Sequence, residues 1–94
     1  MEHGWLVADP SDLRWQAWEG TYSIYNRASG ETHLLNELPA EILRRLSAGP
    51  TDSPSLALAI AEDLGLENTR EWQSKIDTIL ASLFELGLIE STQG

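Results

Sequence analysis

Hydrophobic and polar residues alternate along residues 13–25, which is the spacing of a β-strand pair with one buried face. A two-residue loop at Glu19 and Gly20 pairs Trp18 with Thr21 and sets the register of both strands. The side chains predicted to face the core are Leu13, Trp15, Ala17, Tyr22 and Ile24, and those predicted to face outward are Arg14, Gln16, Trp18, Thr21, Ser23 and Tyr25. The pattern predicts an antiparallel hairpin.

A second turn over residues 26–30 leads into a third strand, Thr32–Leu35, which makes the hairpin a meander. No strand is expected directly after it, because the spacing of apolar residues becomes helical at Asn36. Upstream, Trp5–Val7 is a short apolar segment that either pairs beside the first strand or packs across it. The third strand is therefore predicted to be an edge strand.

The helical spacing predicts three helices, each with a capping residue before it and a glycine after it. These pairs are Asn36 and Gly49, Ser53 and Gly65, and Asn68 and Gly87. The predicted core-facing residues are Leu38, Ile42, Leu43 and Leu46, then Leu56, Ala59, Ile60 and Leu64, then Trp72, Ile76, Ile79, Leu80 and Leu83, with Leu88 and Ile89 folding back after the last helix. Strands followed by helices predict an α+β fold.

The chain has 94 residues, enough for one domain, and a formal net charge of −9 from fifteen acidic and six basic residues. An acidic, unclustered charge pattern opposes nucleic-acid binding. The chain has no cysteine, so it has no disulfide or thiolate chemistry. With no apolar run near the roughly 20 residues of a membrane span and no basic secretion signal, we expect a cytoplasmic protein without membrane contact. Residues 1–4 and 91–94 are expected to be flexible ends.

Candidate catalytic groups are few. His3 lies near the N-terminus, which leaves His33 as the one candidate base; its neighbour Thr32 points to the opposite face of the strand. The acidic pairs Glu62-Asp63 and Glu67 with Glu71 are typical of a solvated helix surface, and no Gly-rich phosphate loop or zinc motif is present. The sequence predicts no enzyme activity, no metal site and no cofactor.

Two features instead suggest binding. The segment Thr32–Leu35 has none of the Lys, Pro or inward charges that protect an edge strand, so either a helix covers it or a peptide adds to it as a further strand. Trp18 and Tyr25 form an exposed aromatic pair, which is either a contact surface or covered by the Trp5 segment.

The chain also resembles a known family. The residues that carry the resemblance are the W-x-x-W hairpin, the stretch YSIYNRASGETHLLNELPAEILRRL and the ending LFELGLIE. Over residues 5–90 they are similar to the PqqD-like proteins, also called RiPP recognition elements, and most similar to the PqqD-like proteins of HPr-kinase-related systems. The most specific part is G-x-T-H-L-L-N at residues 30–36.

The resemblance implies a winged-helix-like fold of three antiparallel strands and three helices, which binds the leader of a precursor peptide between its third strand and third helix. It assigns the backbone contacts to Thr32, His33, Leu34 and Leu35, and the helical wall to Trp72, Lys75, Ile76 and Ile79. The other implied partner is a separate peptide-modifying enzyme, here one related to HPr kinase. The chain itself would be a chaperone without bond chemistry.

Two alternatives remain open. A winged-helix DNA-binding regulator fits the ending LFELGLIE, but the net charge opposes it and only Arg70 and Lys75 lie near the third helix. An adaptor subunit could instead bind a folded protein through the face with Trp18 and Tyr25.

Overall fold

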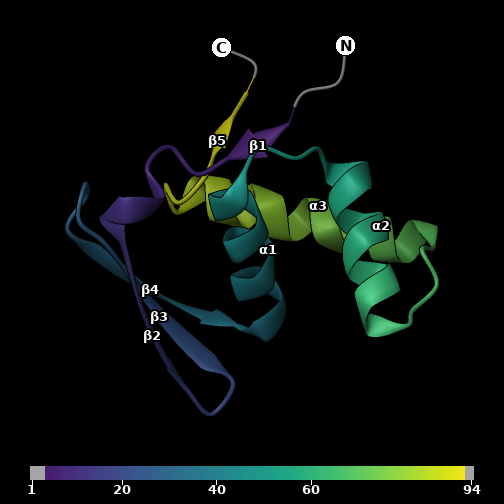
Figure 1. Ribbon diagram of the computed structural model, residues 1–94, viewed down its shortest axis with the longest axis horizontal. Coiled ribbons are helices and arrows are strands. Elements are labelled where there is room, and N and C mark those ends of the chain that lie inside the picture. The colour runs from purple at the N-terminus through teal and green to yellow at the C-terminus, as the bar shows by residue number, and fades with distance from the viewer. Residues whose placement is uncertain (1–3, 93–94) are drawn as a thin grey trace.

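The computed structural model describes residues 4–92 of the protein, which form a small sheet followed by helices (Figure 1). The elements in chain order are β1 (Trp5–Leu6), a 3-10 turn (Pro10–Asp12), β2 (Leu13–Trp18), β3 (Thr21–Asn26), β4 (Glu31–Asn36), α1 (Glu37–Ala48), α2 (Ser53–Leu64), α3 (Arg70–Glu85) and β5 (Glu90–Ser91). The predicted α+β fold, a three-stranded antiparallel sheet followed by three helices, is confirmed.

The main sheet has the strand order β2-β3-β4, and its register is the predicted one. Trp18 is opposite Thr21, and Trp15 is opposite Ile24. Both loop residues have positive φ, 49° at Glu19 and 78° at Gly20, which matches the right-handed twist of the strands they join. The third predicted strand is one residue longer at each end and forms β4.

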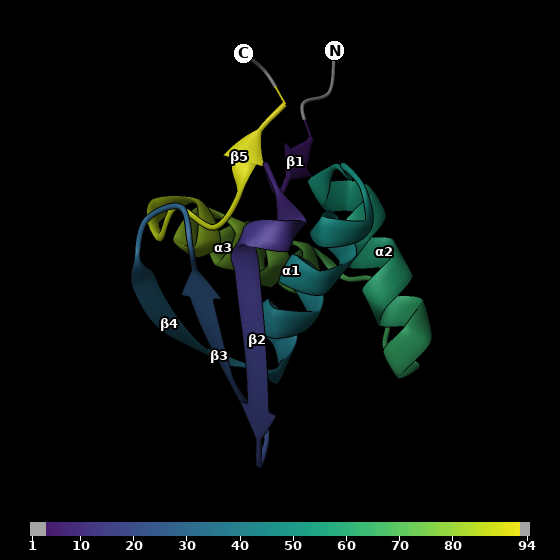
Figure 2. The same ribbon diagram turned by 60° about the vertical axis from the view of Figure 1, so that its left-hand side comes forward.

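The N-terminal segment takes a place that the sequence did not predict. Strand β1 does not pair beside β2; it pairs with β5 at the other end of the chain, and the two lie side by side in Figures 1 and 2. Trp5 also exchanges backbone hydrogen bonds with Thr51, at 2.9 and 3.1 Å. The pairing continues at Gly4, whose N donates to Thr92 Oγ1 at 2.7 Å. The rest of the expected flexible ends, with His3, lies outside the described residues.

The helix starts differ from prediction by one residue in two cases. Asp52, rather than Ser53, caps α2 by accepting a hydrogen bond from the Ser55 N at 2.8 Å. Thr69, rather than Asn68, caps α3 by accepting from the Trp72 N at 3.1 Å. Each predicted cap stands beside another residue with a capping side chain, and the residue that reaches the third helical N–H becomes the cap.

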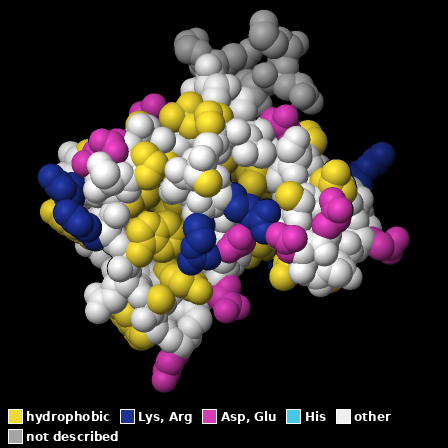
Figure 3. All heavy atoms as spheres, in the orientation of Figure 1, with side chains coloured by type: hydrophobic (Ala, Val, Ile, Leu, Met, Phe, Trp, Pro, Cys, Tyr) yellow, Lys and Arg dark blue, Asp and Glu magenta, His cyan; other side chains and the backbone are white. Residues whose placement is uncertain are grey.

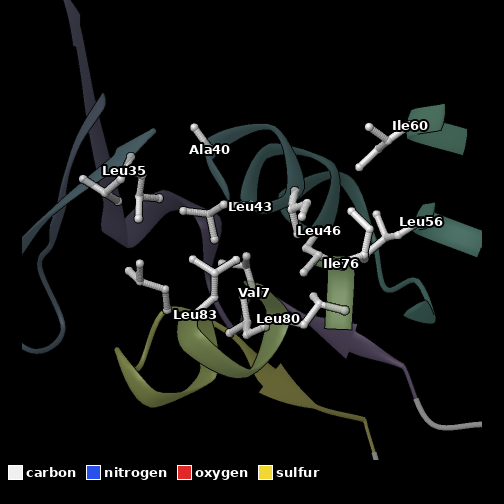
Figure 4. Packing of buried hydrophobic residues seen from close by; sticks show 14 of the residues in the cluster. Val7, Leu35, Ala40, Leu43, Leu46, Leu56, Ile60, Ile76, Leu80 and Leu83 are labelled. Atoms are coloured by element: carbon white, nitrogen blue, oxygen red, sulfur yellow. The ribbon is translucent and has the colours of Figure 1, made fainter. Parts of the chain in front are cut away.

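The core lies between the sheet and the helices (Figure 4). Most predicted core positions of α1 and α3 are fully buried, as are Leu88 and Ile89. Helix α2 departs from the prediction, because Ala57 and Ala61 are buried while Leu64 is 59% exposed. The buried residues of α2 are Leu56, Ala57, Ile60 and Ala61. Leu64 lies on the same side of the helix but is its last residue, past the buried turns.

Candidate functional site

Strand β4 is an edge of the sheet, as predicted. It pairs with β3 on one side, and within residues 4–92 no strand pairs with its other side. In Figure 2, β4 lies at the outer margin of the sheet, on the side of β3 opposite to β2. Leu34 is 68% exposed, whereas the next residue, Leu35, is buried in the core. The edge of β4 is therefore accessible, while the buried side chain of Leu35 packs the strand against the core.

The hydrogen-bond pattern tells which backbone groups of β4 point outward. Arg27 N donates to Asp12 O at 2.8 Å, which continues the ladder between β3 and β2. In a central strand, successive residues hydrogen-bond alternately to one neighbouring strand and to the other. Since Arg27 bonds to β2, Ile24, three residues earlier, bonds to β4, where its partner is His33. The N–H and C=O groups of Thr32 and Leu34 consequently point away from the sheet. This narrows the four predicted backbone contacts to two, since those of His33 and Leu35 are directed at β3.

His33 lies opposite Ile24 on the core-facing side of the sheet. Its side chain is 14% exposed, and its Nε2 is 3.6 Å from Glu31 Oε1, too far for a hydrogen bond. Within the described residues this buried nitrogen has no hydrogen-bond partner. Between residues 4 and 92 no hydroxyl group is hydrogen-bonded to the buried Nε2 of His33, so the geometry offers no support for its action as a base.

The four predicted residues of α3 do not form one uniform wall. Ile76 is fully buried, and Figure 4 places it at the end of the core near Leu56, away from Leu35. Trp72 is held against α2, because its Nε1 donates a hydrogen bond to Ala57 O at 2.8 Å. Lys75 is exposed and Ile79 half-buried. At 100° per residue, Trp72, Lys75 and Ile79 lie within about 60° of one another on α3. Of the predicted wall, only Ile76 is therefore fully buried.

Two adjoining cavities, which the sequence did not indicate, lie on another side of the molecule and share Tyr22 and Arg44. The smaller, about 300 Å³, is lined by Trp15, Ala17, Tyr22, Arg44 and Ser47. The larger, about 510 Å³, is lined by Tyr22, Glu37, Leu38, Glu41, Arg44, Arg45, Ile60, Asp63, Leu64 and Trp72. Figure 3 shows hydrophobic side chains gathered between the sheet and α1, with charged side chains beside them.

Two arginine side chains of α1 line these cavities: Arg44 lines both, and Arg45 lines the larger one. The Arg44 guanidinium lies 5.3 Å from the Trp15 ring centroid and 5.6 Å from that of Tyr22, in the range of a cation–π contact. Arg45 donates to Glu41 Oε2 at 2.8 Å and also to Asp63, so it links α1 to α2. The hydrogen bond to Asp63 raises the pKa of Arg45, which stays charged. The cavity walls thus carry paired charges.

The aromatic pair lies where it was predicted. Trp18 and Tyr25 are 49% and 41% exposed on the side of the sheet away from the core. The Trp5 segment does not cover them, because the Trp5 ring packs edge-on against Phe84 of α3 with centroids 5.6 Å apart. The sequence allowed two interpretations of this aromatic pair, a contact surface or burial under the Trp5 segment, and the structure excludes the second.

The described residues show little that suggests chemistry. Among them, no group of three or more acidic or histidine side chains could hold a metal ion. Asp63 of the predicted acidic pairs is bonded to Arg45, and Glu62, Glu67 and Glu71 are exposed. Of the helices between residues 4 and 92, none has both the length and the apolar character that a bilayer crossing requires.

Comparison with known proteins adds no relative. No family model matches the chain, and no curated protein and no solved structure matches it. The resemblance to PqqD-like proteins therefore rests on the residues quoted for it.

Proposed function

We propose that this protein is a cytoplasmic, non-catalytic peptide-binding domain that captures the leader segment of a precursor peptide and presents it to a modifying enzyme. The leader adds as a strand to the free edge of β4. The observation that carries the proposal is this edge itself: a six-residue strand, Glu31–Asn36, which contains neither lysine nor proline and has one side that no strand of residues 4–92 pairs with. Natural sheets commonly protect such edges.

In this arrangement, the outward N–H and C=O groups of Thr32 and Leu34 bond to the peptide backbone. Backbone bonds supply affinity but no sequence choice, so selectivity comes from side chains beside the edge. Leu34 offers an exposed apolar contact on one face of the added strand. The family resemblance assigns further contacts to α3, where Lys75 is exposed and Ile79 is half-buried. By holding the leader, the domain raises the effective concentration of the rest of the peptide at the enzyme.

Proline substitution tests the edge directly. Leu34→Pro removes an outward N–H and places a ring where the peptide would lie, so we expect its affinity for leader peptide to fall by about tenfold or more. The measurement is a fluorescence titration with synthetic leader peptides taken from precursor-like reading frames near the gene. Circular dichroism checks that the variant is folded.

Two controls separate the effect of losing the backbone N–H from the effects of losing the Leu34 side chain or of adding a proline elsewhere in the sheet. Leu34→Ala removes the side chain but keeps the N–H, and should bind within a few-fold of wild type. Ala17→Pro likewise removes an outward N–H, but from the other edge strand, β2. By the alternation of hydrogen bonds described for β3, the outward N–H groups of β2 are those of Leu13, Trp15 and Ala17. Ala17→Pro should bind as wild type does. Equal affinity of Leu34→Pro and wild type would refute docking at β4.

A further inference from the structure

The side of the sheet turned away from the core is a second distinct surface. It is formed by Arg14, Gln16 and Trp18 of β2, Thr21, Ser23 and Tyr25 of β3, and Thr32, Leu34 and Asn36 of β4, which we call the outer face. The described helices lie on the other side of the sheet in both Figures 1 and 2. Trp18, Tyr25 and Leu34 are each at least 41% exposed, so three large apolar side chains meet solvent on one small face.

The charge of the outer face is unlike that of the chain as a whole. The chain has fifteen acidic residues, yet none of the outer-face positions holds one. Its single charged side chain is Arg14, which is exposed and makes no ion pair within residues 4–92. A surface with exposed aromatic residues, no acidic residue and a single arginine has the composition of a contact surface rather than of ordinary protein surface.

A second copy of this chain fits the outer face poorly. It would bring another unpaired Arg14 and no carboxylate, and each copy carries a net charge of −9. The face is also small: three six-residue strands cover roughly 20 Å by 15 Å, whereas each partner of a stable complex buries about 800 Å². A transient contact with a different protein, which supplies a carboxylate opposite Arg14, satisfies both constraints.

We propose that the outer face docks a folded protein that presents an apolar patch beside a carboxylate. That this protein is the peptide-modifying enzyme rests on the proposed function. Leu34 belongs to the outer face and also to the β4 edge, so the two surfaces are contiguous. A leader held along β4 would then lie next to the docked enzyme, which explains how one small domain delivers a peptide without contacting its reactive segment.

A photo-crosslinking experiment on the full chain identifies the partner. p-Benzoylphenylalanine replaces Gln16, which lies between Arg14 and Trp18 on the outer face, and the variant is crosslinked in the cells that make the protein. The crosslinked protein is identified by mass spectrometry, purified, and titrated by calorimetry against wild type, Arg14→Glu, Trp18→Ser and Arg70→Glu. Arg70, exposed at the start of α3, gives a charge reversal of the same kind away from the sheet.

We expect Arg14→Glu to weaken the partner's affinity by about tenfold or more, because a carboxylate then faces a carboxylate. Trp18→Ser should weaken it as well, and Arg70→Glu should leave it within about twofold of wild type. Unchanged affinity in Arg14→Glu and Trp18→Ser would overturn the proposal, as would crosslinks only between copies of this chain or to no protein. The affinity for leader peptide, measured separately, should not change in Arg14→Glu. The expected loss of leader affinity in Leu34→Pro is a test of the β4 edge alone.

Discussion

The two edges of the main sheet have similar backbones and different surroundings. Strands β2 and β4 are each six residues long and each leave one side unpaired within the described chain. Beside β2, the core-facing side chains of Trp15 and Ala17 line a cavity with Arg44, and Arg14 adds a charge to the outward side. Beside β4, the exposed side chains of Thr32 and Leu34 carry no charge.

This difference means that the two free edges are not equivalent as places for a peptide to add. A strand added to β2 would have to fit its side chains next to a guanidinium that already covers two aromatic rings, and a charge at an edge opposes strand addition. A strand added to β4 meets no stacked arginine, and the one charged residue of β4, Glu31, lies at the start of the strand. The surrounding side chains, and not the backbone, distinguish the two edges.

The largest expected effect concerns how β4 is anchored. Leu35→Ala removes a buried side chain and should lower the free energy of unfolding by about 2–5 kcal/mol. Leu34→Ala, one residue earlier, should change it by less than about 0.5 kcal/mol, because that side chain is exposed. Urea unfolding followed by circular dichroism measures both. Similar losses for the two variants would mean that β4 is not anchored through one face.

A smaller effect is expected at the β2 edge. Arg44→Met keeps much of the aliphatic stem but loses the contacts with Trp15 and Tyr22 and the partly exposed ion pair with Glu41, which together should cost about 1 kcal/mol of stability. The control is Arg70→Met, which removes an exposed arginine from α3. If both variants unfold at the same urea concentration, the stacked arginine does not stabilise this edge. Leader affinity should be unaffected in either.

The smallest effect is expected for Trp18→Ser in the leader titration. Trp18 lies on β2, away from β4 in the sheet order, so leader affinity should stay within about twofold of wild type. A large loss of affinity would show that the peptide lies across the outer face and not along the β4 edge. The same variant therefore distinguishes the two surfaces of the sheet.

The sequence was sufficient for most of the local structure. Period-two alternation and the Glu19-Gly20 loop predicted the register of β2 and β3, because both depend on neighbouring residues. The helix ends at Gly65 and Gly87 were equally readable, since each needs a positive φ that glycine adopts readily. Caps were misplaced by one residue only where two capping side chains adjoin.

The candidate site was only partly predictable. The exposed edge and the outward Trp18 and Tyr25 followed from the alternation. The division of α3 did not, because Trp72 and Ile76 share a helical stripe with Ile79 but contact different neighbours. A periodic pattern identifies a buried face of a helix; it does not say which element covers each residue of that face.

The order of strands and helices, the hairpin register and the edge position of β4 could be predicted from the amino-acid pattern, because these follow from residues a few positions apart. The pairing of β1 with β5 and the position of Arg44 against Trp15 and Tyr22 became visible only in the folded chain. Those contacts join segments distant in the chain, and two-residue strands have no period to reveal them. Local geometry is set by neighbouring residues, whereas long-range partners are set by how the finished elements pack.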